Sequence, residues 1–276
     1  MTTFSSNAPP SQTGCRIRVL VVDDSAVIRR LISQVLEEDP GIEVVGTAQN
    51  GAIALQRIQQ SNPDVITLDV EMPEMDGIET LRRIRKSHPQ IRVIMCSTLT
   101  ERGATTTMEA LSLGASDYIA KASNAGSLDK SLQALKADLI PKIKQFFPPA
   151  NVLSRPALLR KTPLKDPANA TATTATTAST TKTVWAKNPF PEVLAIGVST
   201  GGPTALSDIM PLIPANFPLP ILIVQHMPPI FTKLLAERLS SRCKIRVEEA
   251  RNGMPVEPGC ALIAPGDFHM LSLIHI

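Results

Sequence analysis

Short apolar runs alternate with amphipathic stretches between residues 17 and 147. Runs of strand length cover residues 17–22, 42–48, 65–69, 93–97 and 118–121. Apolar residues recur at helical spacing over residues 25–39, 51–60, 77–87, 105–113 and 127–147. Strands that alternate with helices predict a parallel sheet covered by helices on both faces. We therefore expect an α/β domain with a five-stranded parallel sheet over residues 17–140.

A second α/β pattern begins near residue 191. Its predicted strands cover residues 193–198, 219–225, 245–248 and 260–264, and its predicted helices cover residues 203–212 and 231–242. Pro203 suits the first turn of the first of these helices, where its missing N–H has no partner to lose. The pattern predicts an incomplete, doubly wound, Rossmann-like domain over residues 191–276.

Residues 148–190 separate the two patterns and are rich in alanine, threonine and proline. They contain few large apolar side chains, so they cannot bury enough surface to offset the entropy lost on ordering. We expect this segment to be a flexible linker between the two domains.

The bulk composition excludes several classes of protein. A formal net charge of +3 over 276 residues and an aromatic content of 3% give no basis for nucleic-acid binding. The four cysteines form no CxxC or Cys/His pattern, which indicates free thiols in a reducing compartment. The sequence shows no signal peptide and no apolar run of membrane-spanning length. We therefore expect a cytoplasmic protein without direct membrane insertion.

Groups that bind cations or phosphate follow matched strand ends in the first domain. They are Asp23 and Asp24 at the end of the first strand, Asp69 at the end of the third, Ser97 at the end of the fourth and Lys121 at the end of the fifth. Because the carboxyl ends of parallel strands share one edge, these side chains should converge on one crevice. Three carboxylates there would repel one another unless a hard cation such as Mg²⁺ neutralised them. A carboxylate beside Mg²⁺ can accept a phosphoryl group, whereas separate roles as helix caps explain this matched set poorly.

Three motifs carry this pattern: Val-Val-Asp-Asp-Ser, Leu-Asp-Val-Glu-Met-Pro-Glu-Met-Asp-Gly and Tyr-Ile-Ala-Lys. Together they resemble the signature of two-component receiver domains, over residues 17 to about 140. The resemblance implies a flavodoxin-like fold and phosphorylation of Asp69 by a histidine kinase. It also implies a Mg²⁺ site formed by Asp23, Asp24, Asp69 and the backbone carbonyl of Glu71.

The same resemblance implies roles for the switch residues. Ser97 would be the switch hydroxyl, Lys121 the phosphate-sensing lysine and Tyr118 the rotating aromatic. The family has a proline in a cis peptide bond after the lysine, and this chain has Ala122 there instead. Because a cis bond before any other residue is costly, we expect the loop after Lys121 to differ from the family pattern.

The segment Gly-Val-Ser-Thr-Gly-Gly-Pro at residues 197–203 joins a predicted strand to a predicted helix. Its glycines permit a tight turn, and N–H groups at the helix start can stabilise an oxyanion. Ser199 needs a base to act as a nucleophile, and His226 would face it if the two strands are neighbours. Alternatively, Ser199 is a helix N-cap, the turn binds a phosphate, or His226 is an ordinary loop histidine. Standard α/β-hydrolases place an acid between the serine and the histidine, which argues against that fold.

The second domain also contains Val-Gln-His-Met-Pro and Ile-Ala-Pro-Gly-Asp-Phe-His-Met. With the receiver-like domain ahead of them, these motifs resemble the response-regulator type of chemotaxis protein-glutamate methylesterase. The resemblance implies that Ser199 attacks glutamate methyl esters of chemoreceptors, with His226 as general base, and that methanol and then glutamate are released. It also implies deamidation of receptor glutamines. In this family, phosphorylation at the position of Asp69 relieves a block of the catalytic cleft by the receiver.

The third member of a catalytic triad has no counterpart in the sequence. In the family, an aspartate from a later Asp-Gly segment orients the histidine, and no Asp-Gly segment lies between His226 and Ile276. Asp267, His269 and His275 receive no catalytic role, and we expect the native continuation to be lost after about Met270. The alternative function is therefore a phosphorylation-dependent binding module without esterase activity. A DNA-binding output is disfavoured because no basic recognition helix follows the linker.

Overall fold

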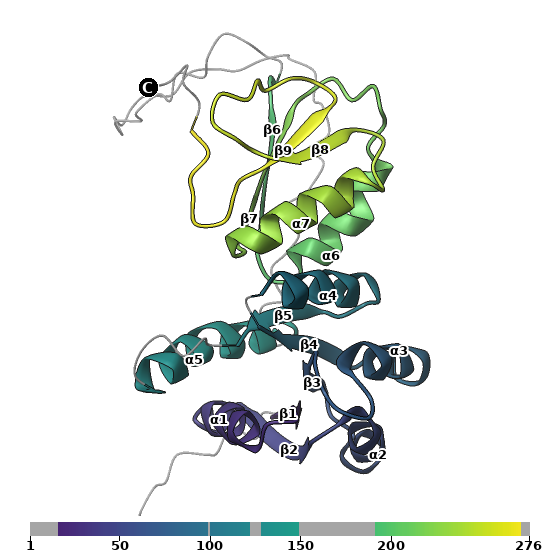
Figure 1. Cartoon of the computed structure of the whole chain (residues 1–276), viewed down its shortest axis with the longest axis vertical. Coiled ribbons are helices and arrows are strands. Elements are labelled where there is room, and N and C mark those ends of the chain that lie inside the picture. The colour runs from purple at the N-terminus through teal and green to yellow at the C-terminus, as the bar shows by residue number, and fades with distance from the viewer. Residues whose placement is uncertain (1–15, 99, 122–127, 149–190, 272–276) are drawn as a thin grey trace, which may run out of the picture.

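The computed structural model describes residues 16–98, 100–121, 128–148 and 191–271, and for residues 128–131 it describes the backbone alone. Residues 149–190 of the predicted linker and Ala122 lie outside the described residues, so the predictions about them stay predictions. The described chain forms two α/β units, which we call the receiver unit (residues 16–148) and the second unit (residues 191–271), packed against each other (Figure 1). Among the helices in these ranges, none has the length and hydropathy that a membrane span requires.

The receiver unit contains the five-stranded parallel sheet that the sequence predicts. Its strands lie in the order β2 (Ile42–Ala48), β1 (Ile17–Val22), β3 (Val65–Asp69), β4 (Arg92–Ser97) and β5 (Asp117–Ala120). The helices on one face are α1 (Ala26–Glu37) and α5 (Leu128–Gln145), and those on the other are α2 (Gly51–Ser61), α3 (Gly77–Ser87) and α4 (Glu101–Ser112) (Figure 1). The predicted α/β architecture is confirmed.

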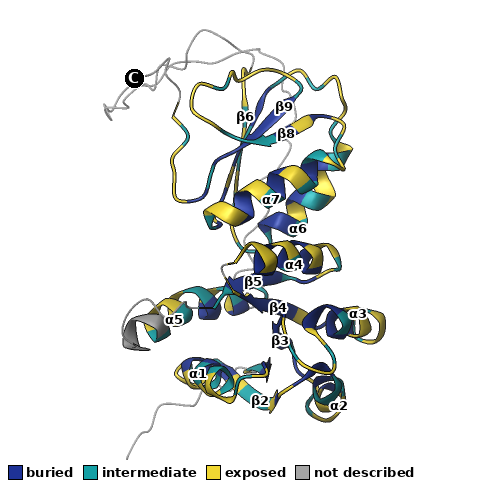
Figure 2. Cartoon of the chain, in the orientation of Figure 1, coloured by how far each residue is buried: buried dark blue, intermediate teal, exposed yellow. Residues whose placement is uncertain are grey.

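The central strands are buried on both faces of this sheet (Figure 2). In β1, Leu20 and Val22 belong to the apolar core on the side of α2 and α3, whereas Val19 and Val21 pack with α1 and α5. All four side chains are fully buried. A strand covered on both sides requires an almost unbroken apolar run, which explains why this segment lacks the alternation of a half-exposed strand.

The second unit contains a four-stranded parallel sheet in the order β6 (Leu194–Val198), β7 (Ile221–Gln225), β9 (Cys260–Ile263) and β8 (Arg246–Glu249). Its helices are α6 (Gly202–Ile209), the short 3₁₀ helix η2 (Met210–Leu212) and α7 (Pro229–Ser240). Ile196 and Ile223 pack into the core, whereas Ala195 and Val224 on the other face are exposed. In the described residues, helices therefore cover one face of this sheet, and its α/β class and parallel order agree with the prediction.

Several predicted boundaries differ from the structure, and three of the differences have a clear cause or consequence. Helix α4 begins at Glu101 rather than at residue 105, because the Thr100 hydroxyl accepts the N–H of Gly103 and caps the helix. Strand β7 begins at Ile221 rather than at residue 219, because the prolines at positions 218 and 220 lack the N–H that a strand ladder uses. Strand β5 begins at Asp117, one residue earlier than predicted. This last difference places an acidic side chain inside the sheet.

The two units share a buried contact in which α4 lies against α6 and α7 (Figure 1). Tyr118 of β5 stacks on Phe231 of α7, with ring centroids 4.7 Å apart and planes 8° from parallel. Met108 and Leu206, one from each unit, belong to the same buried apolar cluster as these two rings. The Arg238 guanidinium of α7 donates a hydrogen bond of 2.8 Å to the backbone carbonyl of Met108. Apolar packing and directed hydrogen bonds together hold the units in one orientation.

Candidate functional site

The structure brings the acidic residues at the strand ends together. One carboxylate oxygen from each of Asp23, Asp24 and Asp69 lies within 4.8 Å of the others. Lys121 enters the same site after β5, with its Nζ atom 2.7 Å from Asp69 Oδ1 and 2.8 Å from Asp23 Oδ2. Asp23 and Asp69 are almost fully buried, whereas Asp24 is exposed. The site therefore combines two buried carboxylates, one ammonium group and one carboxylate open to solvent.

Burial and the neighbouring Lys121 shift the pKa of Asp69 in opposite directions. Burial raises the pKa of Asp69 to about 6, and repulsion from Asp23 adds to this rise, while the hydrogen bond from Lys121 opposes it. Burial alone would lower the pKa of Lys121, but its hydrogen bonds with Asp23 and Asp69 outweigh burial and raise that pKa. The lysine thus stays protonated and offsets the charge of the two buried acids.

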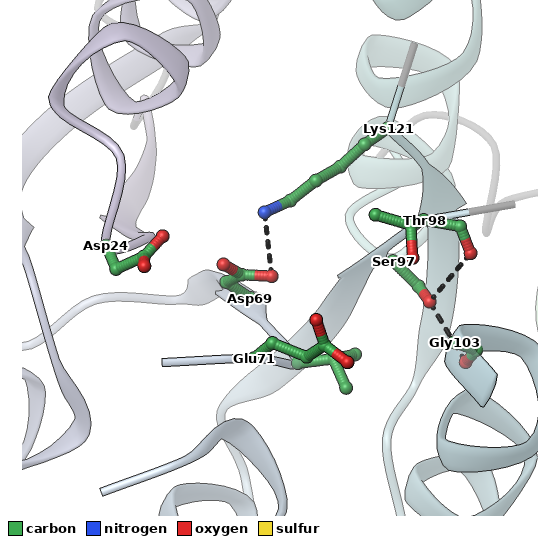
Figure 3. Close-up of a pocket in the computed structure, with 8 residues that line it drawn as sticks. Asp24, Asp69, Glu71, Ser97, Thr98, Gly103 and Lys121 are labelled. Atoms are coloured by element: carbon green, nitrogen blue, oxygen red, sulfur yellow. Dashed lines mark hydrogen bonds and ion pairs between the residues drawn. The ribbon is translucent and has the colours of Figure 1, made fainter. Parts of the chain in front are cut away.

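A pocket of about 220 Å³ opens beside Asp69. Its lining includes Asp24, Asp69, Glu71, Ser97 and Lys121 (Figure 3). The Ser97 hydroxyl donates toward the backbone carbonyls at residues 98 and 103, at 3.3 and 3.0 Å, rather than toward the carboxylates. The Glu71 side chain reaches outward, with its Oε1 atom 3.6 Å from the Arg102 guanidinium. The structure therefore brings Ser97 to the pocket wall and leaves its hydroxyl turned toward α4.

Tyr118 lies at the contact between the two units and not in the acidic pocket. Its side chain is 5% exposed, and burial raises the pKa of its hydroxyl. Lys142 Nζ lies 5.2 Å from the centre of the ring and donates a hydrogen bond of 2.7 Å to the backbone carbonyl of Tyr118. The ring therefore contacts Phe231 of the second unit and Lys142 of its own unit.

In the second unit, Ser199 and His226 leave neighbouring strands at the same edge. Val198 of β6 pairs with Gln225 of β7, and the His226 N–H donates to the Val198 carbonyl at 3.1 Å. The next residue on each strand is Ser199 or His226, so the strands are neighbours as the sequence argument requires. Both residues are exposed. In the described part of the chain, no hydrogen bond joins their side chains, and no carboxylate forms a hydrogen bond or ion pair with the His226 ring.

Gln225 ties the two loops together and was missed by the sequence reasoning. Its side chain is 5% exposed, and its Nε2 atom donates to the backbone carbonyls of Ser199 at 3.0 Å and His226 at 3.1 Å. A Cβ atom on Gly202 would lie 2.0 Å from Gln225 Oε1, which explains why the turn needs glycine there. A buried amide in an otherwise apolar strand, next to the candidate base, was the available signal.

The turn after Ser199 has the shape of a tight turn into α6. The N–H of Gly202 donates to the Ser199 carbonyl at 2.9 Å, and Gly201 adopts a left-handed conformation with φ of 71°. The N-cap of α6 is Gly201, and no side chain caps this helix. The alternative in which Ser199 is the N-cap is therefore wrong.

Asp117 connects the receiver unit to this turn and was also missed by the sequence reasoning. Its Oδ2 atom accepts the N–H of Gly201 at 3.0 Å, and its Oδ1 atom accepts the N–H of Tyr118 at 2.7 Å. The side chain is 3% exposed, and burial raises the pKa of its carboxyl. Because the sequence predicted that β5 begins at residue 118, Asp117 was assigned to a loop.

Two family models match the chain in tandem. The response regulator receiver domain matches residues 19–133, and the CheB methylesterase matches residues 194–273. Among solved structures, the response regulator domain of Thermotoga maritima CheB is 45% identical, covers 47% of this chain and 95% of that chain, and has a TM-score of 0.43. The CheB methylesterase catalytic domain of the same organism is 56% identical, covers 28% of this chain and 41% of that chain, and has a TM-score of 0.28.

Longer proteins match this chain across both of its units. A protein-glutamate methylesterase/protein-glutamine glutaminase of Trichodesmium erythraeum is 48% identical over 256 residues, which are 93% of this chain and 69% of that protein. The protein of the same name from Thermotoga maritima is 43% identical over 256 residues, or 92% of this chain and 67% of that protein. The chain thus spans about two thirds of the length of these relatives. It belongs to the CheB-type protein-glutamate methylesterase/protein-glutamine glutaminase family, with a receiver domain ahead of a methylesterase domain.

Proposed function

We propose that this chain hydrolyses glutamate methyl esters of chemoreceptors, and deamidates receptor glutamines, under the control of phosphorylation at Asp69 in the cytoplasm. The observation that carries the proposal is the pairing of β6 with β7, which sets Ser199 and His226 side by side at one sheet edge. The names of the relatives support the same reactions. The acidic cluster around Asp69 supplies the regulated input.

The proposed phosphoryl donor is the phosphohistidine of a chemotaxis histidine kinase. An oxygen of Asp69 attacks the phosphorus, the P–N bond breaks, and the kinase histidine leaves with its electron pair and takes up a proton. Lys121 is placed to hold an oxygen of the transferred group, because its Nζ atom lies 2.7 Å from Asp69. Charge neutralisation at fixed positions is the main contribution of proteins to phosphoryl transfer.

The donor set around Asp69 fits a magnesium ion. Oxygens of three carboxylates lie within 4.8 Å of one another, and hard cations select such ligands. We assign Asp23, Asp24, Asp69 and the backbone carbonyl of Glu71 as the protein's share of a Mg²⁺ site. When bound, the ion would neutralise charge on the transferred phosphoryl group and on the acids themselves.

In the proposed output reaction, Ser199 Oγ attacks the ester carbonyl of a receptor glutamate while His226 takes the hydroxyl proton. The tetrahedral intermediate expels methanol, which receives that proton from the histidine. Water then attacks the glutamyl-serine ester with the same histidine as base, and frees both glutamate and Ser199. For a receptor glutamine, the leaving group is ammonia.

The contact between the two units is the proposed route of control. Tyr118 of β5 stacks on Phe231 of the second unit, and Lys121 directly follows β5. A phosphoryl group on Asp69 would attract Lys121 and the Ser97 hydroxyl, shift the ends of β4 and β5, and loosen the contact. The domains, taken as residues 17–140 and 191–276, would then separate on a linker of residues 148–190.

Methanol release from methylated receptor membranes tests the proposal. We expect phosphodonor to stimulate release by the wild-type chain, Ser199→Ala to abolish release, and Asp69→Asn to abolish the stimulation alone. Ser207→Ala is the matched control, because the Ser207 hydroxyl bonds within α6 to the Pro203 carbonyl. Release by Ser199→Ala at the wild-type rate, or full stimulation of Asp69→Asn, would show that the proposal is wrong.

A second candidate is a phosphorylation-dependent binding module without esterase activity. One observation favours it: among the described residues, no carboxylate forms a hydrogen bond or ion pair with the His226 ring, and a histidine base ordinarily depends on such a partner for its orientation. This candidate predicts that the chain drains phosphoryl groups from the kinase and releases no methanol. The same assay, run beside loss of kinase phosphohistidine, distinguishes the two functions.

A further inference from the structure

The four strands of the second unit run parallel, so their carboxyl ends share one edge of the sheet. Ser199 directly follows β6 and His226 directly follows β7 at this edge. The other two strands bring Gly266, which lies in the turn after β9, and Glu249, which is the last residue of β8. Glu249 is therefore an acidic residue at the same sheet edge as the candidate nucleophile and base, and the proposed reaction gives it no role.

Thr232, in the first turn of α7, joins Glu249 to the turn after β9. Its side chain is fully buried, and its Oγ1 atom accepts the N–H of Gly266 at 3.1 Å. The same atom lies 2.6 Å from Glu249 Oε1 and 2.7 Å from the Pro229 carbonyl oxygen. A hydroxyl has one proton to donate, and a carboxylate is a stronger acceptor than a carbonyl. The Thr232 hydroxyl therefore donates to Glu249 while it accepts from Gly266.

Gly266 lies directly against the backbone that follows the candidate base. A Cβ on Gly266 would lie 2.4 Å from the Met227 carbonyl oxygen and 2.4 Å from the backbone nitrogen of Pro229, so only glycine fits there. Asp267, the next residue, adopts a left-handed conformation with φ of 64°. A residue other than glycine keeps such a conformation only where neighbouring contacts hold it. The turn is thus a closely held surface against the segment that joins His226 to α7.

The backbone of His226 is held from two sides. On the side of β6, its N–H donates to the Val198 carbonyl at 3.1 Å, and its carbonyl accepts from Gln225 Nε2 at 3.1 Å. On the side of β9, the Gly266 turn packs on the residues that follow it. Among the described residues, no carboxylate forms a hydrogen bond or ion pair with the His226 ring. The position of the ring therefore depends on the backbone that carries it, and Thr232 holds one of the two surfaces that fix this backbone.

We propose that Thr232 and Glu249 are positioning residues for His226, which act by holding the Gly266 turn against the backbone that follows the base. This inference rests on the proposed function, in which His226 takes the proton of Ser199. Thr232 is fully buried, and its hydrogen bonds go to Glu249, Gly266 and the α7 backbone rather than to the reacting groups. A displacement of about 1 Å in an active site can lower a rate about a hundredfold. The network thus acts on kcat and leaves substrate binding unchanged.

Steady-state methanol release by the full chain, with phosphodonor present, tests the role of the Thr232 hydroxyl. We expect Thr232→Val, which keeps the side-chain shape, to lower kcat about tenfold and to leave KM within about twofold of wild type. Thr232→Ser keeps the hydroxyl and should retain kcat within about twofold. Glu249→Gln leaves only a neutral acceptor and should lower kcat about threefold. Ser241→Ala is the matched control, because the Ser241 hydroxyl bonds to the Arg238 carbonyl at the far end of α7.

Amide hydrogen exchange in the full ¹⁵N-labelled chain tests the same contact without relying on catalysis. We expect Thr232→Val to speed exchange of the Gly266 N–H about fivefold, because this donor loses its acceptor. Exchange of the His226 N–H, which donates to Val198, should speed up as well, since the segment behind it is loosened. Thr232→Ser should restore slow exchange at both positions. Faster exchange at Gly266 alone would show that the turn does not position the base, and would overturn the proposal.

The two measurements separate this inference from the proposed function. If the wild type releases methanol and Thr232→Val has the wild-type kcat, the inference is wrong and the proposed function stands. Equal losses in Thr232→Val and Thr232→Ser would also overturn the inference, because the hydroxyl would then have no effect of its own. If thermal unfolding shows that Thr232→Val does not fold, Glu249→Gln decides, and a wild-type kcat in that variant overturns the inference. If neither wild type nor variants release methanol, the proposed function fails, and exchange of the His226 N–H alone decides the inference.

Discussion

The hydrogen bond from Arg238 to Met108 allows a quantitative prediction about control. Arg238→Ala removes a charged donor that lies 2.8 Å from the Met108 carbonyl across the contact between the units. Hydrogen bonds from charged groups contribute about 1.5–3 kcal/mol. Arg238 Nε is buried without a hydrogen-bond partner, and burial lowers the pKa of the guanidinium, so desolvation offsets part of this gain. The net contribution should therefore lie near the lower limit, about 1.5 kcal/mol, which is roughly a tenfold change in the docked-to-open ratio.

The assay compares methanol release with and without phosphodonor. We expect Arg238→Ala to raise the unphosphorylated rate about tenfold and to leave the phosphorylated rate within about twofold, because in the proposed mechanism phosphorylation already opens the contact. Arg242→Ala is the matched control just after the end of α7, since Arg242 is exposed and, among the described residues, forms no side-chain hydrogen bond across the contact. Hydrogen exchange of α4 and α7 amides gives a second readout that does not depend on catalysis.

Two results would refute this reasoning. If Arg238→Ala and wild type had equal unphosphorylated rates and equal exchange of α4 amides, the hydrogen bond to Met108 would not stabilise the docked state. If Arg242→Ala raised the rate as much as Arg238→Ala, a general loss of positive charge would explain the effect. Thermal unfolding of each variant shows whether the second unit remains folded, which both comparisons require.

Three further predictions concern single residues of the two sites. Gln225→Ala should lower kcat at least about tenfold with little change in KM, because it releases the loops that carry Ser199 and His226. Steady-state methanol release measures this effect. An equal loss in Gln60→Ala, which removes an exposed amide of α2, would contradict the prediction. Mg²⁺ at about ten times its Kd should stabilise the receiver unit by about 1.4 kcal/mol and raise its Tm, measured by calorimetry, by several degrees. Asp24→Asn should reduce this rise in Tm. An identical rise in the variant would exclude Asp24 as a ligand. Gly202→Ala should lower the Tm of the second unit, because its Cβ would lie 2.0 Å from Gln225 Oε1. Gly197→Ala should be tolerated, because its Cβ would meet no atom within 4 Å. Equal Tm values for the two variants would refute the close packing of the turn.

The fold and the acidic cluster were predictable because each depends on local pattern. Strands buried on both faces, such as β1 and β3, appear in the sequence as apolar runs, and the helices between them as amphipathic stretches. Once strands and helices alternate, parallel order follows, and strand ends must share an edge. Asp23, Asp69 and Lys121 could therefore be placed together from their positions along the chain alone.

The parts that were not predictable depend on contacts between segments far apart in the sequence. The orientation of the Ser97 hydroxyl toward α4 follows from where that helix begins, and the Thr100 cap that sets its start was not recognised. Gln225 acquires its role from the register of β6 against β7. The packing of Tyr118 on Phe231 follows from the docking of two units whose relative position no periodicity encodes.

Asp117 is an acidic residue whose structural role cannot be predicted from the local sequence pattern. The residue lies next to the apolar segment Tyr-Ile-Ala, and an acid there is most simply assigned to a loop, which is how β5 came to be predicted one residue short. An acid that begins a buried strand must instead find N–H donors, because a buried carboxylate without them is strongly destabilising. One donor, the N–H of Tyr118, is local; the other, at Gly201, belongs to the second unit. The second donor belongs to the other unit, so this buried carboxylate also links β5 to the turn that follows Ser199.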